Sequence, residues 1–140
     1  GECVQIFRGH TEEVSGVAAD WNSIEIVSSS YDGDLRLWDR NTGLCTQICE
    51  CPRLRWGEKV AANCVDADWL KMRGLAGYDD DSIRLWDLLS GTCIWNYWCH
   101  EIVEEIDVAW GAGQILCRYD EQTMSVWEID TGKRLECIDV

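Results

Sequence analysis

The chain has 140 residues and carries 26 acidic against 12 basic side chains, which gives a formal net charge of −14. Its apolar share of 46% argues for one globular domain with a real core and against a disordered chain. The charge argues against a nucleic-acid partner and an anionic membrane surface, because both ask for clustered Lys and Arg. No apolar run approaches the roughly 20 residues of a membrane span, so no membrane insertion is expected and other proteins are the favoured partners.

The first predicted element is a single strand over Cys3–Phe7, in a sequence that opens on Gly1 rather than on Met. In composition this strand matches the last strand of each unit that follows it. A strand without neighbours of its own indicates the outer strand of a preceding unit. The sequence therefore predicts that the chain is a piece of a longer array.

Three units of four short strands come next, because alternating apolar residues are bounded by turn residues throughout. The first strand of each unit ends near a tryptophan, in the phrases VAADW, VDADW and DVAW. No stretch has a sustained helical period. The other predicted strands are, unit by unit, Ile24–Ser28, Leu35–Trp38 and Cys45–Cys49; Met72–Ala76, Ile83–Trp86 and Cys93–Tyr97; and Gln114–Arg118, Met124–Trp127 and Leu135–Ile138.

A repeated phrase connects the units: SYDGDLRLWDRNTG at 30–43, GYDDDSIRLWDLLSG at 77–91 and RYDEQTMSVWEIDTG at 118–132. Each contains Tyr-Asp, a polar turn, an alternating strand, a Trp followed by an acid, and a turn that ends in Gly. Trp38 and Trp86 are 48 residues apart, and Trp86 and Trp127 are 41 apart. A period in the forties built from strands and turns favours a propeller-like array.

On these residues the chain resembles the WD-repeat β-propeller family over essentially its whole length. The motifs that carry the resemblance are Gly9-His10, Asp32 and Trp38-Asp39 at the family's spacing. The resemblance implies all-β blades of four antiparallel strands, each tied by hydrogen bonds among a His, a Ser, an Asp and a Trp. A buried indole N–H and an imidazole need such acceptors in any case.

The first unit matches this set fully, whereas the later units depart from it. The second has Gly57-Glu58 at the Gly-His position and Leu75 or Ala76 at the Ser position, and the third ends in Trp127-Glu128. We therefore expect a complete hydrogen-bond network in the first blade and partial networks in the others. The predicted structural set is His10, Ser28, Asp32, Trp38, Trp86, His100, Asp120 and Trp127.

Asp79, Asp80 and Asp81 stand in a row and raise the question of a cation site. They occupy the same turn as Asp32-Gly33-Asp34 and Asp120-Glu121-Gln122. We interpret them as turn residues, with Asp79 or Asp80 accepting a hydrogen bond within the fold. A divalent-ion site is the less favoured alternative, because hard cations need more oxygen ligands than one exposed turn brings together.

The nine cysteines follow no paired zinc spacing, and Cys45 and Cys49 would lie about 13 Å apart on an extended strand. Cys3, Cys45 and Cys93 each follow a glycine by two residues, which indicates a small packed residue copied between repeats. We expect free, mostly packed thiols, and neither a metal nor a cofactor. Free thiols favour an intracellular compartment, cytoplasmic by preference, with an organelle left open.

The first candidate partner-binding residues are three tyrosines, Tyr31, Tyr78 and Tyr119, one before the turn Asp of each unit. The resemblance implies that this position is exposed on the face that commonly binds partners. Tyrosine suits such a surface because it is large, rigid and amphipathic. The alternative interpretation is a packing tyrosine preserved when the repeat was copied.

The second candidate is the loop CECPRLRW at 49–56, which should reach the same face as the tyrosines. Arg53, Arg55 and Trp56 are residue types common in binding hot spots. The alternative is a loop whose Trp56 folds back onto its own blade.

The third candidate is the aromatic outer strand CIWNYW at 93–98. Alternation places Trp95 and Tyr97 on one side and Asn96 and Trp98 on the other. Because a single rim cannot easily bury both sides, Trp95 and Tyr97 are predicted to make a lateral protein contact.

Three blades do not close a ring, since family propellers have about four to eight. The chain is a segment of a longer propeller, pairs with copies of itself, or is covered by a capping partner. The predicted boundaries are 1–7 for the outer strand of a preceding blade, 8–49 for blade one, 50–98 for blade two and 99–140 for blade three.

Catalysis is not expected. The two histidines fall at structural positions of the repeat, and no nucleophile motif or phosphate loop is present in the sequence. We expect a non-catalytic protein-interaction scaffold or assembly subunit. The alternatives are a purely architectural subunit held through its rim and open blade faces and, less favoured, a cation-binding or enzyme-associated unit.

Overall fold

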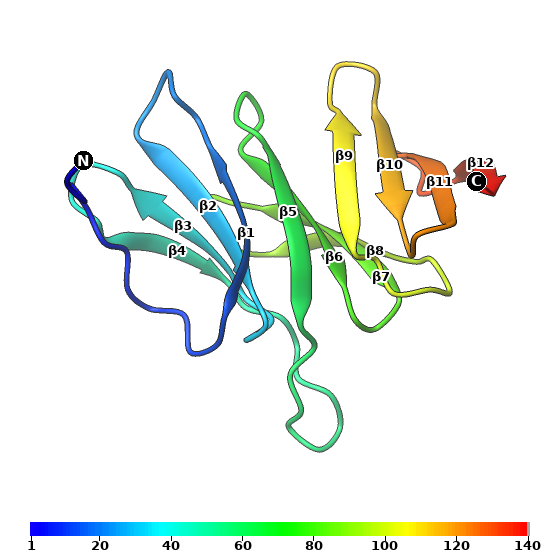
Figure 1. The fold of residues 1–140 in the computed structure, drawn as a ribbon, viewed down its shortest axis with the longest axis horizontal. Helices are drawn as coiled ribbons and strands as arrows, with labels where there is room; N and C mark the ends of the chain where they lie inside the picture. The colour runs from blue at the N-terminus through cyan, green and yellow to red at the C-terminus, as the bar shows by residue number, and fades with distance from the viewer. Residues whose placement is uncertain (140) are drawn as a thin grey trace.

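The computed structural model describes residues 1–139, and this part of the chain folds into twelve β-strands with no helix (Figure 1). The strands form three four-stranded sheets, and in each sheet neighbours in sequence are paired antiparallel. Blade one contains β1 (Val14–Ala19), β2 (Glu25–Ser30), β3 (Leu35–Asp39) and β4 (Cys45–Cys49); blade two contains β5 (Ala62–Asp68), β6 (Arg73–Tyr78), β7 (Ser82–Asp87) and β8 (Cys93–Trp98); blade three contains β9 (Glu105–Ala109), β10 (Gln114–Arg118), β11 (Thr123–Glu128) and β12 (Arg134–Asp139).

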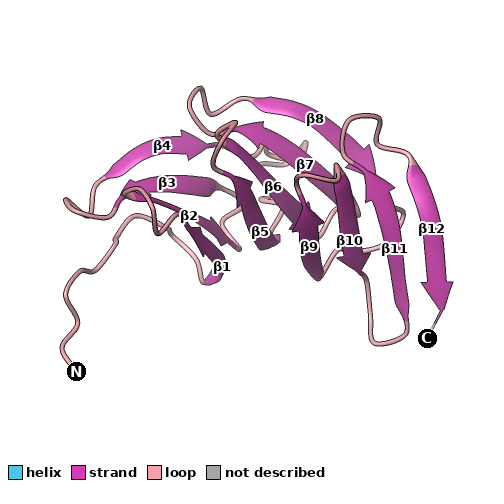
Figure 2. Ribbon diagram, turned by 90° about the horizontal axis from the view of Figure 1, so that it is seen from above, coloured by secondary structure: helices cyan, strands magenta, loops and turns pink. Residues whose placement is uncertain are grey.

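The blades stand side by side in an open arc (Figure 2). The first strands β1, β5 and β9 line the inner side of the arc, and the fourth strands β4, β8 and β12 form its outer rim. The predicted fold is therefore confirmed: the chain is an all-β, incomplete propeller of three antiparallel blades. Along residues 1–139 no helix has the length and apolarity needed to cross a membrane.

Two apolar layers hold the arc together, one between each pair of adjacent blades. Both faces of the middle strands are buried, as the pattern of β7 shows, whereas β12 is almost wholly exposed. One layer joins blade one to blade two through residues such as Val27, Leu35 and Trp86. The other joins blade two to blade three through residues such as Leu75, Ile83 and Ile115. Burial of apolar area between blades is thus the main stabilising term.

The predicted strands agree with the observed ones within one or two residues, except at the N-terminus. Cys3–Phe7 is irregular backbone rather than a strand, because it pairs with no strand of the three sheets formed by residues 1–139. Even so, Gln5 lies against Gly43 of blade one as Gln47 of β4 lies against Gly91 of blade two. The segment therefore lies against blade one much as the outer strand of one blade lies against the next.

Candidate protein-interaction surface

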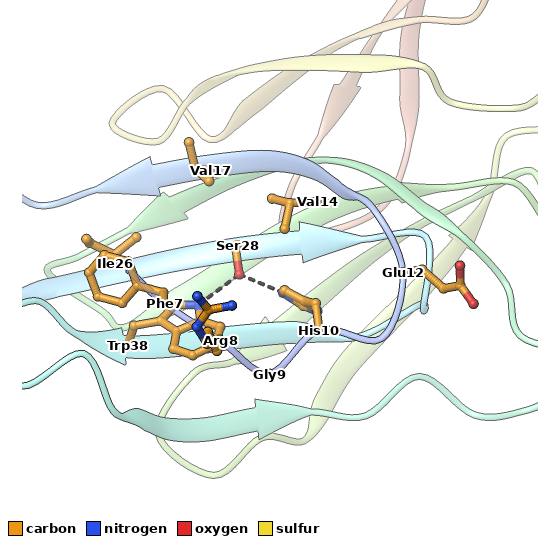
Figure 3. A pocket seen from close by; sticks show the side chains of 10 residues that line it. All are labelled: Phe7, Arg8, Gly9, His10, Glu12, Val14, Val17, Ile26, Ser28 and Trp38. Carbon is orange, nitrogen blue, oxygen red and sulfur yellow. Dashed lines mark hydrogen bonds between the residues drawn. The ribbon is translucent and has the colours of Figure 1, made fainter. Parts of the chain in front are cut away.

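In blade one, four side chains converge on the buried tryptophan. The Trp38 indole N–H donates to the Ser28 hydroxyl at 2.8 Å, and His10 Nε2 lies 2.7 Å from the same oxygen. The other imidazole nitrogen, Nδ1, is 2.9 Å from Asp32 Oδ2, which also accepts the Thr11 backbone N–H. This network ties the loop before β1 to β2 and β3 (Figure 3).

The Asp32 carboxyl is buried, and burial alone would raise its pKa. Backbone N–H groups of Thr11 and Asp34 donate to it, and His10 adds a hydrogen bond and a favourable charge interaction. Together these contacts outweigh burial and hold the pKa of Asp32 below its ordinary value of 3.8. The network is therefore built around an ionised carboxylate.

In blade two the indole N–H of the equivalent tryptophan, Trp86, has a different hydrogen-bond acceptor. Strand register places Ala76 opposite Arg84 as Ser28 lies opposite Arg36, so the serine acceptor is missing. The Trp86 indole N–H donates instead to the Tyr78 hydroxyl at 3.1 Å. Burial raises the pKa of Tyr78, so this phenol stays protonated and neutral.

Blade three uses a tyrosine and a serine together. The Trp127 indole N–H lies 2.8 Å from the Tyr119 hydroxyl and 2.6 Å from Ser125 Oγ, and the two hydroxyls bond to each other. The hydrogen-bond set predicted for this blade was wrong in two members. Asp120 is exposed and caps its own turn by accepting the Gln122 and Thr123 N–H groups, and His100 is exposed without a hydrogen bond to Trp127 among residues 1–139.

The prediction of three exposed tyrosines is also corrected. Tyr31 is 47% exposed, but Tyr78 and Tyr119 are 0% and 5% exposed. Tyr31 stands seven residues before its tryptophan, whereas the other two stand eight before theirs. Since side chains alternate along a strand, a one-residue difference sends them to opposite faces. The number of residues between the tyrosine and the tryptophan was the signal in the sequence that separates buried from exposed tyrosines. The shared Tyr-Asp phrase was misleading.

The same register resolves the row of three acids. Asp80 is the equivalent of Asp32. In both blades five residues connect the last paired residue of the second strand to the first paired residue of the third strand, and each Asp is the third of these five. It forms an ion pair with the buried Arg84, whose guanidinium also contacts Cys51 and stacks over Tyr78. Asp79 accepts from Asn63 at 2.7 Å, and Asp81 has the positive φ of a turn residue. Among the described residues no cluster of three potential metal ligands forms.

The loop between blades one and two is the most prominent projection of the molecule, below β5 in Figure 1. Its tip is an ordered turn, because Gly57 N–H donates to the Leu54 carbonyl at 2.8 Å and Leu54 N–H donates to the Glu58 carbonyl at 2.9 Å. Gly57 has φ +78°, which the turn requires. The two central residues, Arg55 and Trp56, are consequently presented outward.

The candidate binding side chains of this loop are exposed to solvent, and the loop does not fold back onto its blade. Trp56 is 85% exposed, and Arg53 and Arg55 are exposed beside it. The ends of the loop are fixed, since Cys51 and Val60 are buried. The structure thus presents an aromatic and two basic side chains on a firmly rooted turn.

The aromatic rim differs from its prediction. Trp95 and Tyr97 stack on each other, with ring centroids 3.7 Å apart, and both are half-buried. The Tyr97 ring occupies the space that a Cβ on Gly132 of blade three would take. These two residues are therefore engaged inside the chain, and Trp98, at 58% exposure, is the aromatic residue that faces outward.

All nine cysteines are free. Burial raises the pKa of the Cys49, Cys64 and Cys99 thiols to about 12, so they remain protonated at neutral pH. A protonated buried thiol is a poor nucleophile and a poor metal ligand. The buried cysteines accordingly serve as small packing residues. The prediction of a packed thiol is wrong for Cys3 and Cys93, which are exposed.

A hollow of about 420 Å³ opens on the outer face of blade one (Figure 3). Its wall includes Phe7, Val14 and Ile26, together with Ser28 and His10. Both polar residues already hold hydrogen bonds of the Trp38 network. The hollow combines this apolar surface with the side chains of Arg8 and Glu12, which also line it.

Comparison with known proteins identifies the repeat. A family described as "WD domain, G-beta repeat" matches residues 1–39. The mouse protein "WD repeat-containing protein 75" is 43% identical over 44 residues, which is 31% of this chain and 5% of that protein. "WD repeat-containing protein pop1" of Schizosaccharomyces pombe is 44% identical over 45 residues, 32% of this chain and 6% of that protein.

A third relative, "Ribosome biogenesis protein BOP1 homolog" of Arabidopsis thaliana, is 35% identical over 46 residues, 33% of this chain and 6% of that protein. The matched segments thus span only about a twentieth of these relatives' length. Among solved structures, the computationally designed Ika4 protein has a TM-score of 0.75 at 18% identity and covers 100% of this chain and 79% of that one. The designed Ika8 protein has a TM-score of 0.73 at 17% identity, over 94% and 38%.

The fold and the hydrogen-bonded tryptophan of each blade define an incomplete β-propeller of three blades. The sequence matches add a likeness to the WD-repeat proteins, whose family model matches residues 1–39. WD repeats generally mediate protein interaction and assembly and are generally not enzymatic.

Proposed function

We propose that the chain is a non-catalytic scaffold or assembly subunit that binds other proteins through the loop tip formed by residues 53–57. The observation that carries the proposal is the ordered presentation of Trp56, at 85% exposure, directly after Arg53 and Arg55 in a strongly acidic chain. Trp and Arg are the side chains most often found at binding hot spots. A turn that is already ordered loses little conformational entropy when it binds.

Residues outside the loop tip also support this role. Tyr31 is exposed above a shallow hollow that it lines together with Asn63, Asp79, Ile102 and Glu104. Lys59 Nζ donates to Thr11 Oγ1 at 2.9 Å, which links the loop to blade one. A partner anchored on Trp56 can therefore extend toward Tyr31.

The nine free cysteines favour an intracellular, cytoplasmic setting for this binding.

A second candidate function is purely architectural, with the chain held through its rim and open blade faces. Trp98 at 58% exposure on the rim and Val17 at 68% on blade one favour it. In this case a further sheet or a second copy would cover the ends of the arc.

A quantitative co-purification from cells that express the tagged chain distinguishes the two functions. It compares the partners retained by three variants. Trp56→Ala combined with Arg55→Ala should remove the specific partners and leave the fold intact, because both side chains are exposed. Trp98→Ala and the matched turn control Thr42→Ala should retain them. Loss of partners with Trp98→Ala, and not with the loop variant, would replace the scaffold proposal with the architectural one.

A further inference from the structure

The turns that connect the first and second strands of each blade lie opposite the Trp56 loop, at the upper edge of Figure 1. Each of these turns begins with a tryptophan, which is Trp21, Trp69 or Trp110. The proposed scaffold function uses none of the three. Two of them, Trp69 and Trp110, stand at equivalent junctions, the first between blades one and two and the second between blades two and three.

The second junction is held by an arginine that contacts both an aspartate and a tryptophan. Arg73 of β6 donates to Asp68 Oδ2 at 2.9 Å, and both side chains are largely buried. The Arg73 guanidinium carbon also lies 5.6 Å from the centroid of the Trp110 ring. Blade two thus reaches blade three through a guanidinium that stacks on an indole and pairs with a carboxylate.

The first junction has the same carboxylate and the same indole, but an acid takes the place of the arginine. The Asp20 backbone N–H donates to the Glu25 carbonyl at 3.1 Å, and this pair is equivalent in register to the pair of Asp68 with Arg73. Trp69 packs against the apolar layer between blades one and two, as the tryptophan of the second junction packs against the next layer. Glu25 therefore stands where blade two has its arginine.

The charged groups of the first junction have only local partners. The Asn22 backbone N–H donates to Asp20 Oδ1 at 2.9 Å, and the Ser23 hydroxyl donates to Glu25. Within residues 1–139 neither carboxylate forms an ion pair, and no Lys or Arg stacks over the Trp69 ring. The described residues thus supply no cation to a junction that has the acceptor and the aromatic face for one.

A hollow of about 380 Å³ opens at this junction. Its lining includes Asp20 and Trp69, with Asp68 and Trp110 on the side of the second junction. The volume is within the range of ligand pockets, which is roughly 300–1,000 Å³. Leu70, which also lines the hollow, is 99% exposed and extends it with apolar surface.

We propose that this hollow binds an arginine side chain in a segment of a partner protein, with the guanidinium stacked on Trp69 and paired with Asp20. The partner thereby supplies to the first junction what Arg73 supplies to the second. Arginine is favoured over lysine because a planar guanidinium stacks on an indole and pairs with a carboxylate through two N–H groups. The net charge of −14 favours the approach of a basic segment.

The ligand is an arginine within a polypeptide rather than the free amino acid. The α-carboxylate of free arginine would face Asp20 and Asp68, whereas a residue within a chain has no such charge. The exposed Leu70 also offers apolar contact to the residues beside the arginine. The proposal is independent of the Trp56 loop, and all of its residues lie at junctions inside the arc, so its failure would leave the scaffold proposal untouched.

The test titrates the ¹⁵N-tryptophan-labelled chain with the capped peptide acetyl-Ala-Arg-Ala-amide and follows the indole N–H signals by NMR. Matched peptides carry lysine or citrulline in place of the arginine, and free arginine is titrated separately. Citrulline retains the shape of the side chain without its charge. All titrations are made at low ionic strength, because salt screens charge interactions.

Three variants locate the site, after circular dichroism has shown that they fold. Asp20→Asn removes the charge and retains an oxygen for the Asn22 N–H. Glu25→Arg copies Arg73 and supplies the junction with a guanidinium of its own. The matched control is Glu121→Gln, which removes an exposed carboxylate from a turn of blade three.

The arginine peptide should shift the Trp69 signal and bind about tenfold more tightly than the citrulline peptide, because its charge contacts both groups. It should also bind more tightly than the lysine peptide and free arginine. Asp20→Asn should weaken binding by about fivefold or more, Glu25→Arg should abolish it, and Glu121→Gln should leave it unchanged.

Binding that leaves the Trp69 signal unchanged, or that survives Glu25→Arg, would overturn the proposed site. Equal affinity for the citrulline peptide would show that charge has no part, and equal affinity for the lysine peptide would remove the preference for a guanidinium. Equal affinity for free arginine would exclude a protein segment as the specific ligand. If Glu25→Arg does not fold, equal affinities of Asp20→Asn and Glu121→Gln for the arginine peptide would overturn the site instead.

Discussion

Blade one and blade two contain almost the same phrase, SYDGD and GYDDD, and place its tyrosine in opposite environments. Tyr31 is exposed to solvent, whereas Tyr78 is fully buried and accepts the indole N–H of Trp86. Blade one has no need of a tyrosine there, because Ser28 accepts the Trp38 N–H and His10 and Asp32 complete the network.

The difference shows which part of the repeat is constrained. The buried indole N–H must have an acceptor, because an unpaired buried donor costs about 1–3 kcal/mol. The residue that supplies the acceptor is free to change as long as its oxygen reaches the same point. Blade three, with Tyr119 and Ser125 both in reach of Trp127, combines the tyrosine of blade two with a serine.

Removal of the two tyrosine side chains tests the comparison most severely. Tyr78→Ala should lower the free energy of unfolding by about 3–5 kcal/mol, because it empties a fully buried aromatic site. Tyr31→Ala should change it by less than about 0.5 kcal/mol, as expected for an exposed residue. Urea unfolding followed by tryptophan fluorescence measures both, and equal losses would show that the two tyrosines share one environment.

Removal of the blade-one acceptor should have the next largest effect. Ser28→Ala leaves the Trp38 N–H and one imidazole nitrogen without their shared partner, so a loss of about 1–3 kcal/mol is expected. The exposed turn serine Ser90 provides the control, and Ser90→Ala should cost less than about 0.5 kcal/mol. A neutral Ser28→Ala would mean that the network contributes nothing to stability.

Removal of single hydroxyl groups sharpens the comparison between blades two and three. Tyr78→Phe should cost about 1–2 kcal/mol, because it takes away the acceptor of the Trp86 N–H. Tyr119→Phe should cost less than about 1 kcal/mol, because Ser125 Oγ still lies 2.6 Å from Trp127 Nε1. Denaturant midpoints in the reverse order would contradict the assigned acceptors.

The pH dependence of blade one gives the smallest effect. The pKa of Asp32 is lower in the folded chain than its ordinary value of 3.8, so its contribution to stability is present above about pH 4 and is lost as the pH falls through the folded pKa. The stability gap between the wild-type chain and Asp32→Asn should therefore narrow as the pH falls below 4. A gap that stays constant down to pH 2 would show that the carboxylate is not ionised in the network.

Much of the fold could be predicted from the sequence, because the phrase around Trp38, Trp86 and Trp127 recurs with turn residues at fixed offsets. Twelve strands, their antiparallel order and the open arc follow from that repeat. The predicted strand at Cys3–Phe7 is not observed, since this segment pairs with none of the strands in the described residues.

The candidate site was harder to predict, because exposure depends on neighbours in space. Trp95 and Tyr97 are engaged within the chain only because Gly132 of the next blade leaves room for the Tyr97 ring. The buried tyrosines were misplaced because the repeats were aligned on Tyr-Asp instead of on strand register. The exposure of Trp56 rests on a turn whose hydrogen bonds the sequence signals only through Gly57.

The most direct test of the account observes the indole N–H groups themselves by NMR in the ¹⁵N-tryptophan-labelled chain. Trp38, Trp86 and Trp127 should show slow hydrogen exchange, and Tyr78→Phe should shift and accelerate exchange of the Trp86 N–H alone. If the Trp86 signal is unchanged, or if all three indoles respond together, the three blades do not hold their tryptophans with separate acceptors.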